Sequence, residues 1–92
     1  LILAIRGMHL ETATVLLDAK ANPNLADTEK MSPLHVAADI GFVDGVKLLV
    51  DRNANINSRN VYLMTPLLMA AAAGHDTIAE VCYFIAKHPE TF

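Results

Sequence analysis

The 92-residue sequence predicts an all-α solenoid, in which antiparallel helix pairs stack side by side and hairpin-like loops join one pair to the next. Three observations lead to this prediction. Sequence segments recur 33 residues apart, each copy opens with a helix-start signal, and the stretches that follow carry apolar residues at helical spacing. Self-similarity at one period of 20 to 50 residues is the signature of a repeat array.

The 33-residue period is visible at several independent positions. Pro33 recurs as Pro66 and Gly41 recurs as Gly74. Longer segments recur at the same step: 21–24 (Ala-Asn-Pro-Asn) as 54–57 (Ala-Asn-Ile-Asn), and 32–38 (Ser-Pro-Leu-His-Val-Ala-Ala) as 65–71 (Thr-Pro-Leu-Leu-Met-Ala-Ala). Because these coincidences share one period, they predict repeated structural units rather than chance similarity.

The first helix of each unit has clear start and stop signals. Ser32 is a good N-cap and Pro33 follows at the first helical position, where a missing N–H has no effect on the helix. Gly41 is expected to end this helix, because a left-handed backbone conformation is favourable mainly for glycine. Thr65, Pro66 and Gly74 repeat the same arrangement one unit later.

A second helix is predicted after each of these turns. Val43, Val46, Leu49 and Val50 follow helical spacing, so they are expected to share one buried face. Asn53 is predicted to end this helix, since asparagine is the next-best residue after glycine for a left-handed cap. A loop of about a dozen residues then leads to the next cap and can project as a hairpin.

This pattern resembles the ankyrin repeat. The closest unit contains Ser-Pro-Leu-His-Val-Ala-Ala at 32–38, then Gly41, Val-Lys-Leu-Leu-Val at 46–50 and Asn-Ala-Asn-Ile-Asn at 53–57. The resemblance implies one ankyrin-repeat domain spanning 1–92. Its expected divisions are an incomplete first repeat at 1–26, a complete second repeat at 27–59 and a third, divergent or incomplete repeat at 60–92.

Several positions depart from the family pattern. Met8 is interpreted as an extra residue that bulges the turn after Gly7, and Lys20 occupies the site after the second helix where the family usually has glycine. Lys30 and Leu63 stand where the loop tips usually have glycine, which brings the usual turn of both loops into question. In the third unit Leu68 replaces the histidine of the motif, whereas His35 is expected to bridge the Ser32 cap and a neighbouring loop.

Composition argues against nucleic acid and membrane insertion. Seven Lys and Arg residues against ten Asp and Glu residues give a formal charge of −3 and a pI near 5.7. A nucleic-acid surface needs a basic stripe, and the basic residues here are scattered. The longest apolar run, 61–73, is broken by Thr65 and Pro66 and falls short of the roughly 20 residues of a membrane span.

The chain ends and the cysteine content give two further expectations. The chain lacks an initiator methionine, and apolar residues concentrate at its ends, including Leu3 and Ile5 at one end and Phe84, Ile85 and Phe92 at the other. These ends are expected to be covered by further repeats of the same chain, or alternatively by self-association. The single cysteine and the absence of Asn-x-Ser/Thr agree with an intracellular location, in the cytoplasm or the nucleus.

No pattern predicts catalysis, a metal or a cofactor. The four histidines lack the paired spacing of a zinc site, and the glycines do not form a phosphate loop. Cys82 lies in an apolar stretch and is expected to be a buried structural thiol. Asp39 and Asp44 flank a turn, where solvated surface charge is the expected role. We therefore expect a chain that is not an enzyme.

The resemblance implies that a protein partner binds the loop tips and the exposed flank of each first helix. The corresponding candidates in the second unit are Asp27, Thr28, Glu29, Met31, Asp39 and Ile40. Those in the third unit are Arg59, Asn60, Val61, Tyr62 and Met64, with Ala72 and Ala73 at the helix end. The sequence leaves open whether Leu63 and Met64 face solvent or fold back against the neighbouring repeat.

Two alternatives concern modification and parentage. The resemblance makes Asn24 and Asn57 candidates for β-hydroxylation by an intracellular oxygenase, and the competing interpretation is that each amide ties down its own loop. The leading function is an interaction module of scaffold or adaptor type. The alternative is a regulatory or targeting segment of a larger enzyme or channel whose activity lies outside this chain.

Overall fold

The structure is a computed structural model that describes residues 1–89. Phe92, expected in the apolar C-terminal region, lies outside the described residues. Within 1–89 the chain forms six α-helices and no strand: α1 (Ile2–Arg6), α2 (Leu10–Asp18), α3 (Pro33–Ile40), α4 (Val43–Asp51), α5 (Pro66–Ala73) and α6 (Asp76–Lys87). This confirms the predicted all-α class.

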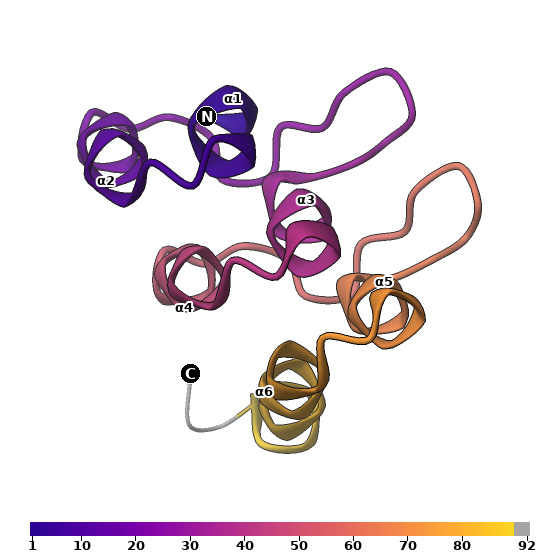
Figure 1. Cartoon of the computed structure of the whole chain (residues 1–92). Helices are drawn as coiled ribbons and strands as arrows, with labels where there is room; N and C mark the ends of the chain where they lie inside the picture. The colour runs from indigo at the N-terminus through magenta and orange to yellow at the C-terminus, as the bar shows by residue number, and fades with distance from the viewer. Residues whose placement is uncertain (90–92) are drawn as a thin grey trace.

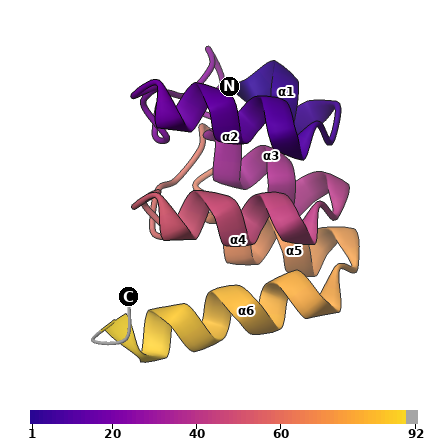
Figure 2. The ribbon, with the colours of Figure 1, turned by 90° about the vertical axis from the view of Figure 1, so that its left-hand side faces the viewer.

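The helices form two parallel rows. Figure 1 looks along the helices and shows α1, α3 and α5 in one row, with α2, α4 and α6 beside them in a second row. The turned view of Figure 2 shows the second row stacked in chain order in front of the first. The central helix α3 packs against α1, α4 and α5. The predicted solenoid of stacked antiparallel helix pairs is confirmed.

The start and stop signals of the first helix in a pair act as predicted. The Ser32 hydroxyl accepts a hydrogen bond from the His35 N–H at 3.2 Å, and the Thr65 hydroxyl accepts one from the Leu68 N–H at 3.3 Å. Gly41 ends α3 in the left-handed conformation with φ 81°, and Gly74 ends α5 with φ 79°. Local capping chemistry therefore sets the bounds of α3 and α5.

Alanine lies where the helices of the first row approach one another. Ala4, Ala37 and Ala70 occupy the same position in successive units and are 6%, 0% and 0% exposed. A side chain without atoms beyond Cβ lets neighbouring helices pack closely at native density. The larger buried residues, including Ile5, Leu34, Val46, Leu49 and Ile78, fill the space between the two rows.

The predicted insertion at Met8 is wrong. Gly7 has a right-handed conformation with φ −82°, and Met8 takes the left-handed position with φ 59°. Met8 lies 33 residues before Gly41, so the period runs through this turn without an extra residue. Gly7 had suggested that the turn is shifted by one residue. The left-handed position of the turn is instead occupied by Met8.

The two loop tips form turns although neither has glycine. Lys30 and Leu63 adopt left-handed conformations with φ 59° and 62°. Their N–H groups donate to the carbonyls of Asp27 and Asn60, each at 3.0 Å. The doubt raised by the missing glycines is therefore corrected, and both loops project as turns beyond the first row of helices (Figure 1). We call these loops finger 1 (residues 27–31) and finger 2 (residues 60–64).

The second row of helices ends differently in the third unit. After α4 the chain leaves the helix through Asn53, which is left-handed with φ 69°. Ala86 occupies the equivalent position 33 residues later, and α6 continues through it to reach 12 residues, against 9 in α4. Alanine has the highest helix propensity, so the stop signal is lost.

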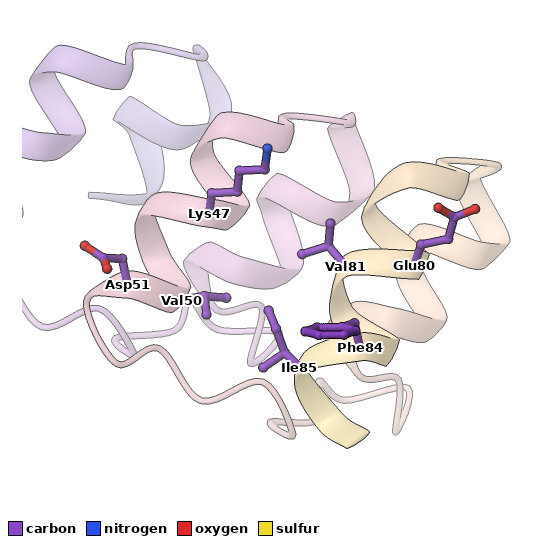
Figure 3. A pocket seen from close by; sticks show the side chains of 7 residues that line it. All are labelled: Lys47, Val50, Asp51, Glu80, Val81, Phe84 and Ile85. Carbon is purple, nitrogen blue, oxygen red and sulfur yellow. The ribbon is translucent and has the colours of Figure 1, made fainter. Parts of the chain in front are cut away.

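A cleft of about 530 Å³ lies between α4 and α6 (Figure 3).

Candidate partner-binding surface

Each finger is held in shape by the side chain of its first residue. In finger 1 the Asp27 carboxylate accepts hydrogen bonds from the N–H groups of Glu29 at 2.9 Å and Met31 at 3.0 Å. In finger 2 the Asn60 amide oxygen accepts from Tyr62 at 2.9 Å and Met64 at 3.1 Å. A side-chain oxygen that satisfies two backbone donors fixes a tight loop without regular secondary structure.

Asn60 is a buried brace, so its assignment as a surface contact is wrong. Its side chain is 2% exposed. The amide nitrogen points toward two sulfur atoms, Sδ of Met31 at 3.2 Å and Sδ of Met69 at 3.6 Å. Its position in the loop had suggested exposure, but both ends of the amide are satisfied inside the molecule.

The two fingers are joined through Glu29. Its backbone carbonyl accepts a hydrogen bond from the Val61 N–H at 3.0 Å, and its carboxylate accepts one from the Tyr62 hydroxyl at 3.0 Å. The hydrogen bond to the carboxylate and the negative charge of Glu29 raise the pKa of Tyr62, with a smaller contribution from burial. Adjacent finger tips therefore act as one surface.

His35 connects the start of α3 to finger 2. Its Nε2 lies 2.6 Å from the Met64 carbonyl, and its Nδ1 lies 3.2 Å from the Ser32 backbone nitrogen and 2.8 Å from the Ser32 hydroxyl. Since a carbonyl can only accept and a backbone N–H can only donate, these partners require a proton on Nε2 and a bare Nδ1. The predicted bridge between the cap and a neighbouring loop is confirmed.

The same environment keeps His35 neutral. The imidazole is fully buried, and burial lowers its pKa from the ordinary value of 6.5, opposed by hydrogen bonds with the backbone of Met64 and Ser58 and by the charge of Asp27. A second ring proton would also face the Ser32 N–H, leaving two donors in contact. His35 is thus a structural support of finger 2.

The exposed candidates lie on the two fingers and at the end of α3. Asp27, Thr28, Glu29, Asp39, Arg59, Val61 and Tyr62 are exposed, as are Ala72 and Ala73 at the end of α5, whereas Met31, Ile40 and Met64 are half-buried. Leu63, which was left outside the candidate set, is 68% exposed at the tip of finger 2. Of the two orientations left open, Leu63 faces solvent and Met64 is partly covered.

Asn24 connects two loops rather than tying down its own. Its amide oxygen accepts a hydrogen bond from the Asn55 N–H, one unit later, at 2.6 Å. The local role belongs to Asn22 and Asn55, whose side chains accept from the N–H groups of Asn24 and Asn57, each at 2.9 Å. The interpretation of Asn24 as a brace of its own loop is therefore corrected.

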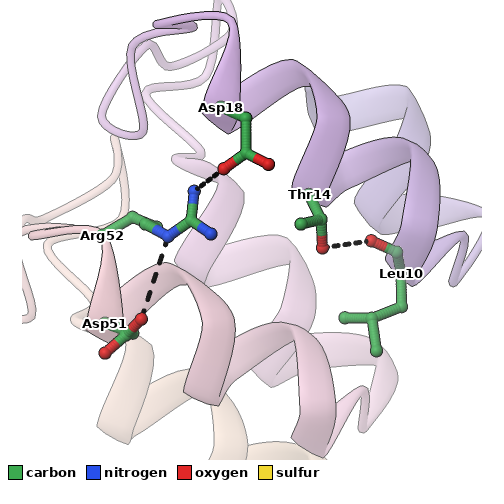
Figure 4. Close-up of polar contacts among 5 residues, drawn as sticks. All are labelled: Leu10, Thr14, Asp18, Asp51 and Arg52. Atoms are coloured by element: carbon green, nitrogen blue, oxygen red, sulfur yellow. Dashed lines mark hydrogen bonds and ion pairs between the residues drawn. The ribbon is translucent and has the colours of Figure 1, made fainter.

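Two further contacts between repeats were not predicted. Arg52 of the second unit pairs with Asp18 of the first, with Nη1 and Oδ1 2.6 Å apart (Figure 4). The same view shows a bond within α2, where the Thr14 hydroxyl donates to the Leu10 carbonyl at 2.8 Å. His75 Nε2 lies 2.9 Å from the Asp39 carbonyl at the end of α3. Neither contact has a sequence signal beyond the period, because each joins residues more than 30 positions apart.

Within the described residues, the cysteine thiol and the side chains that could bind a metal have environments typical of structural rather than reactive groups. Cys82 is 0% exposed, and burial raises the pKa of its thiol to about 11, so the nucleophilic thiolate is disfavoured. Within 1–89, no three His, Cys, Asp or Glu side chains gather to hold a metal ion. None of the helices in this range has the length and apolar character that a membrane crossing requires.

Known proteins share this repeat organisation. The chain is 38% identical over 78 residues to the ARF GTPase-activating protein Git of Drosophila melanogaster, which covers 84% of this chain and 11% of that protein. It is 37% identical over 71 residues to the potassium channel AKT2/3 of Arabidopsis thaliana, covering 77% and 9%. It is 43% identical over 71 residues to the transient receptor potential channel pyrexia of Drosophila melanogaster, covering 77% and 7%.

The chain spans about a tenth of the length of these relatives, so the shared region is the repeat array alone. A family model described as ankyrin repeats, in three copies, matches residues 1–88. The helix pairs, the Ser32 and Thr65 caps and the projecting fingers are the structural counterpart of that match. The chain belongs to the ankyrin-repeat family.

Proposed function

We propose that this chain is a scaffold or adaptor module that binds a protein partner through the finger tips and the adjoining face of α3 and α5. Ankyrin repeats are in general non-catalytic modules of protein interaction. The observation that carries the proposal is the apolar tip of finger 2, where Val61, Tyr62 and Leu63 are 48%, 67% and 68% exposed. Contiguous exposed apolar side chains on a soluble surface mark interaction sites.

The rigidity of the fingers supports this role. Asn60 fixes the backbone of finger 2 from inside, and Glu29 holds the tip from the neighbouring finger. A loop that is already ordered loses little conformational entropy when it binds, so more of the contact energy contributes to affinity. Tyrosine is also an effective anchor, because its ring supplies a large contact area and its hydroxyl a hydrogen bond.

Acidic and basic side chains are distributed unevenly over the surface. Finger 1 carries exposed carboxylates at Asp27 and Glu29, and Asp39 follows at the end of α3, whereas Arg59 precedes finger 2. A partner that matches this surface has basic groups opposite finger 1 and an apolar recess for the tip of finger 2. Such complementarity sets the association rate and the orientation of the complex.

The wider role depends on the protein that contains the array. The relatives include proteins named as a GTPase-activating protein and as two channels, so we propose, as the alternative, a regulatory or targeting segment of a larger enzyme or channel. In both versions the module works inside the cell, in the cytoplasm or the nucleus. We also propose the repeat divisions 1–26, 27–59 and 60–92, since they begin the second and third units at the equivalent residues Asp27 and Asn60.

Tyr62 provides the direct test. A partner is first captured by photo-crosslinking through benzoylphenylalanine introduced in place of Leu63, with the same group in place of Thr12 on α2 as the positional control. Tyr62→Ala is then expected to weaken binding of that partner at least about tenfold in a titration, as for a central aromatic contact. The free energy of unfolding should remain within about 1 kcal/mol of the unmodified chain, because the side chain is exposed.

The conservative variant Tyr62→Phe separates the ring from the hydroxyl. It keeps the contact area and removes only the hydrogen bond to Glu29. Retained affinity in Tyr62→Phe together with lost affinity in Tyr62→Ala assigns the contribution to the ring. Equal affinity of all three proteins for the captured partner would reject Tyr62 as an anchor.

Modification is a separate proposal. We propose Asn57 as the more accessible of the two hydroxylation candidates, since the Asn24 side chain is engaged by the Asn55 N–H and no equivalent bond holds the Asn57 side chain within residues 1–89. Intact-mass analysis after incubation with an asparaginyl oxygenase tests this. A mass increase of one oxygen that disappears in Asn57→Ala supports the proposal, and an unchanged mass contradicts it.

A further inference from the structure

The contact between the two fingers contains one buried amide and two methionine sulfur atoms. Asn60 is 2% exposed, and its Nδ2 lies 3.2 Å from Sδ of Met31 in finger 1 and 3.6 Å from Sδ of Met69 in α5. Within residues 1–89 these two sulfurs are the partners of the amide nitrogen, although a thioether is only a weak acceptor. We call Met31, Asn60 and Met69 the methionine joint.

The preceding unit lacks this arrangement. One period earlier, Asp27 stands at the position of Asn60, and Val36 stands at the position of Met69. An ionised carboxylate has no N–H group to donate, and valine has no sulfur to accept a hydrogen bond. The methionine joint is therefore not a requirement of the repeat. It belongs to finger 2, the finger with the exposed apolar tip.

Met31 contributes to the shape of both fingers. Its N–H donates to the Asp27 carboxylate at 3.0 Å, and its carbonyl accepts from the Asp27 N–H at 3.1 Å, which closes finger 1. Its sulfur contacts the amide of Asn60, whose oxygen accepts hydrogen bonds from the N–H groups of Tyr62 and Met64. A chemical change at this sulfur thus acts on the side chain that shapes finger 2.

The Met31 sulfur is open to oxidation. The side chain is half-buried, which leaves part of it accessible to a small oxidant such as hydrogen peroxide. A thioether sulfur has two lone pairs, and the bond from Asn60 uses one of them. When the other attacks a peroxide oxygen, an S–O bond forms, the O–O bond breaks, and the departing hydroxide leaves as water with the proton of the transferred oxygen. The sulfur is oxidised to a sulfoxide and the peroxide is reduced.

We propose that Met31 is a site of reversible oxidation by peroxide, and that its sulfoxide releases finger 2 from finger 1. An added oxygen does not fit between Nδ2 and Sδ atoms that are 3.2 Å apart. If the oxygen points toward Asn60, the sulfur must retreat from the amide. If it points to solvent, the buried N–H of Asn60 loses this acceptor. Both arrangements break the present joint, which is packed against the core and has little free space.

The consequence for binding rests on the proposed function of the fingers. A displaced Asn60 side chain no longer fixes the N–H groups of Tyr62 and Met64, so the tip of finger 2 loses its single shape. A loop that must be ordered again on binding loses more conformational entropy, and the affinity falls. Methionine sulfoxide reductases, which each reduce one epimer, restore the thioether. Oxidation at Met31 is therefore a reversible control of the finger surface.

Amide hydrogen exchange tests the site without any partner. The 92-residue chain is treated with hydrogen peroxide, and peptide mass spectrometry follows the added oxygen at each of its four methionines. Once Met31 carries the oxygen, the N–H groups of Tyr62 and Met64 should exchange about ten times faster or more, as for an overpacked contact. The Val46 N–H in α4 is the reference and should keep its rate. Treatment with reductases for both epimers should restore the slow exchange.

Matched variants assign the effect to one sulfur. In Met31→Leu, which keeps an apolar side chain of similar size, peroxide should no longer change the exchange of Tyr62 and Met64. Met8→Leu is the control, because Met8 is 53% exposed and lies in the turn between α1 and α2, outside both fingers. This variant should respond to peroxide like the unmodified chain. Met31→Gln places a carbonyl oxygen near the position of the sulfoxide oxygen, so it should show the faster exchange without peroxide.

Four results would overturn the proposal. Unchanged exchange of Tyr62 and Met64 in chains oxidised at Met31 would show that the joint tolerates the sulfoxide, and slower exchange would show that the new oxygen strengthens it. An effect of peroxide that persists in Met31→Leu would assign it to another methionine. An unoxidised Met31 in chains fully oxidised at Met8 would show that the sulfur is inaccessible.

Failure of the proposed function would have a different signature. The partner captured through finger 2 is titrated with the chain before and after oxidation at Met31. Weaker binding after oxidation supports the control of the finger surface. Equal affinity, together with the expected faster exchange at Tyr62 and Met64, would contradict the proposed binding through finger 2 and would still support Met31 as an oxidation site.

Discussion

At the scale of single residues, five non-glycine residues within the described range 1–89 carry positive φ angles: Met8, Lys20, Lys30, Asn53 and Leu63. All five stand at turns that the repeat geometry requires, so the packed helices impose the conformation on side chains that disfavour it. For an L-residue this costs roughly 1–2 kcal/mol, except at asparagine, which tolerates it better. The array therefore stores local strain at Met8, Lys20, Lys30 and Leu63.

Met8 is the clearest place to release that strain. It is 53% exposed and has φ 59°, so replacing its side chain loses little packing. We expect Met8→Gly to raise the free energy of unfolding by about 1 kcal/mol, measured by urea denaturation. Met8→Ala is the matched control and should show no such gain, because alanine also has a Cβ. Equal stabilities of the two variants would contradict the strain argument.

His35 makes stability depend on pH. Because its pKa is lowered in the folded state, the unfolded chain binds the proton more readily, and unfolding is favoured as the pH falls. The sign is therefore fixed: stability is complete above the unfolded pKa of about 6.5 and is lost as the pH falls toward the lower, folded value. We expect the unfolding free energy at pH 5.5 to be below that at pH 7.5.

The variant His35→Leu isolates this contribution, since leucine stands at the equivalent position 68. It should be less stable at pH 7.5, because the Ser32 N–H and the Met64 carbonyl lose their partner. The stability difference between the two proteins should then shrink as the pH is lowered to 5.5. A difference that stays constant across this range would show that His35 does not resist protonation in the folded chain.

At the scale of elements, the helix bounds could be predicted from the sequence, whereas the shape of the fingers could not, and this difference has a physical reason. The bounds of α3 and α5 follow from caps and glycines within a few residues of each end, so local sequence is sufficient. The fingers were doubted because Lys30 and Leu63 replace glycine. The side chains of Asp27 and Asn60 hold the turns by accepting hydrogen bonds from backbone N–H groups. Their place in the sequence did not show whether these side chains brace the loop or face solvent.

The two braces give a prediction for the fingers. Asn60→Ala removes the acceptor for two part-buried N–H groups, so it should lower the unfolding free energy by about 2 kcal/mol. Asp27→Ala removes the equivalent acceptor at an exposed site, where water replaces it, and should cost about half as much or less. Urea denaturation of both variants tests the difference, and a larger loss in Asp27→Ala would contradict it.

At the scale of the whole molecule, the chain is held together by contacts between successive units. The ion pair of Asp18 and Arg52, the bond from the Asn55 N–H to Asn24 and the bond of His75 with the Asp39 carbonyl each cross one junction. The period predicts that units stack, but it does not predict which side chains meet, because that depends on how each unit is rotated against the next. The cleft at α4 and α6 escaped prediction for the same reason.

The junction between Gly41 and His75 offers a measurement of one such contact. A Cβ at Gly41 would lie 2.8 Å from Cε1 of the His75 ring, whereas a Cβ at Gly74 would meet no atom within 4 Å. Both glycines are left-handed, with φ 81° and 79°, so alanine imposes the same backbone strain at each site. The two substitutions therefore differ only in the contact between units.

We expect Gly74→Ala to lower the unfolding free energy by about 1 kcal/mol through backbone strain. Gly41→Ala should cost about 1 kcal/mol more, because the ring must move and release the Asp39 carbonyl. In a His75→Ala background the two alanine substitutions should become equal, and this double-mutant cycle measures the coupling. If the excess cost of Gly41→Ala persists without the ring, the contact with His75 does not join the second and third units.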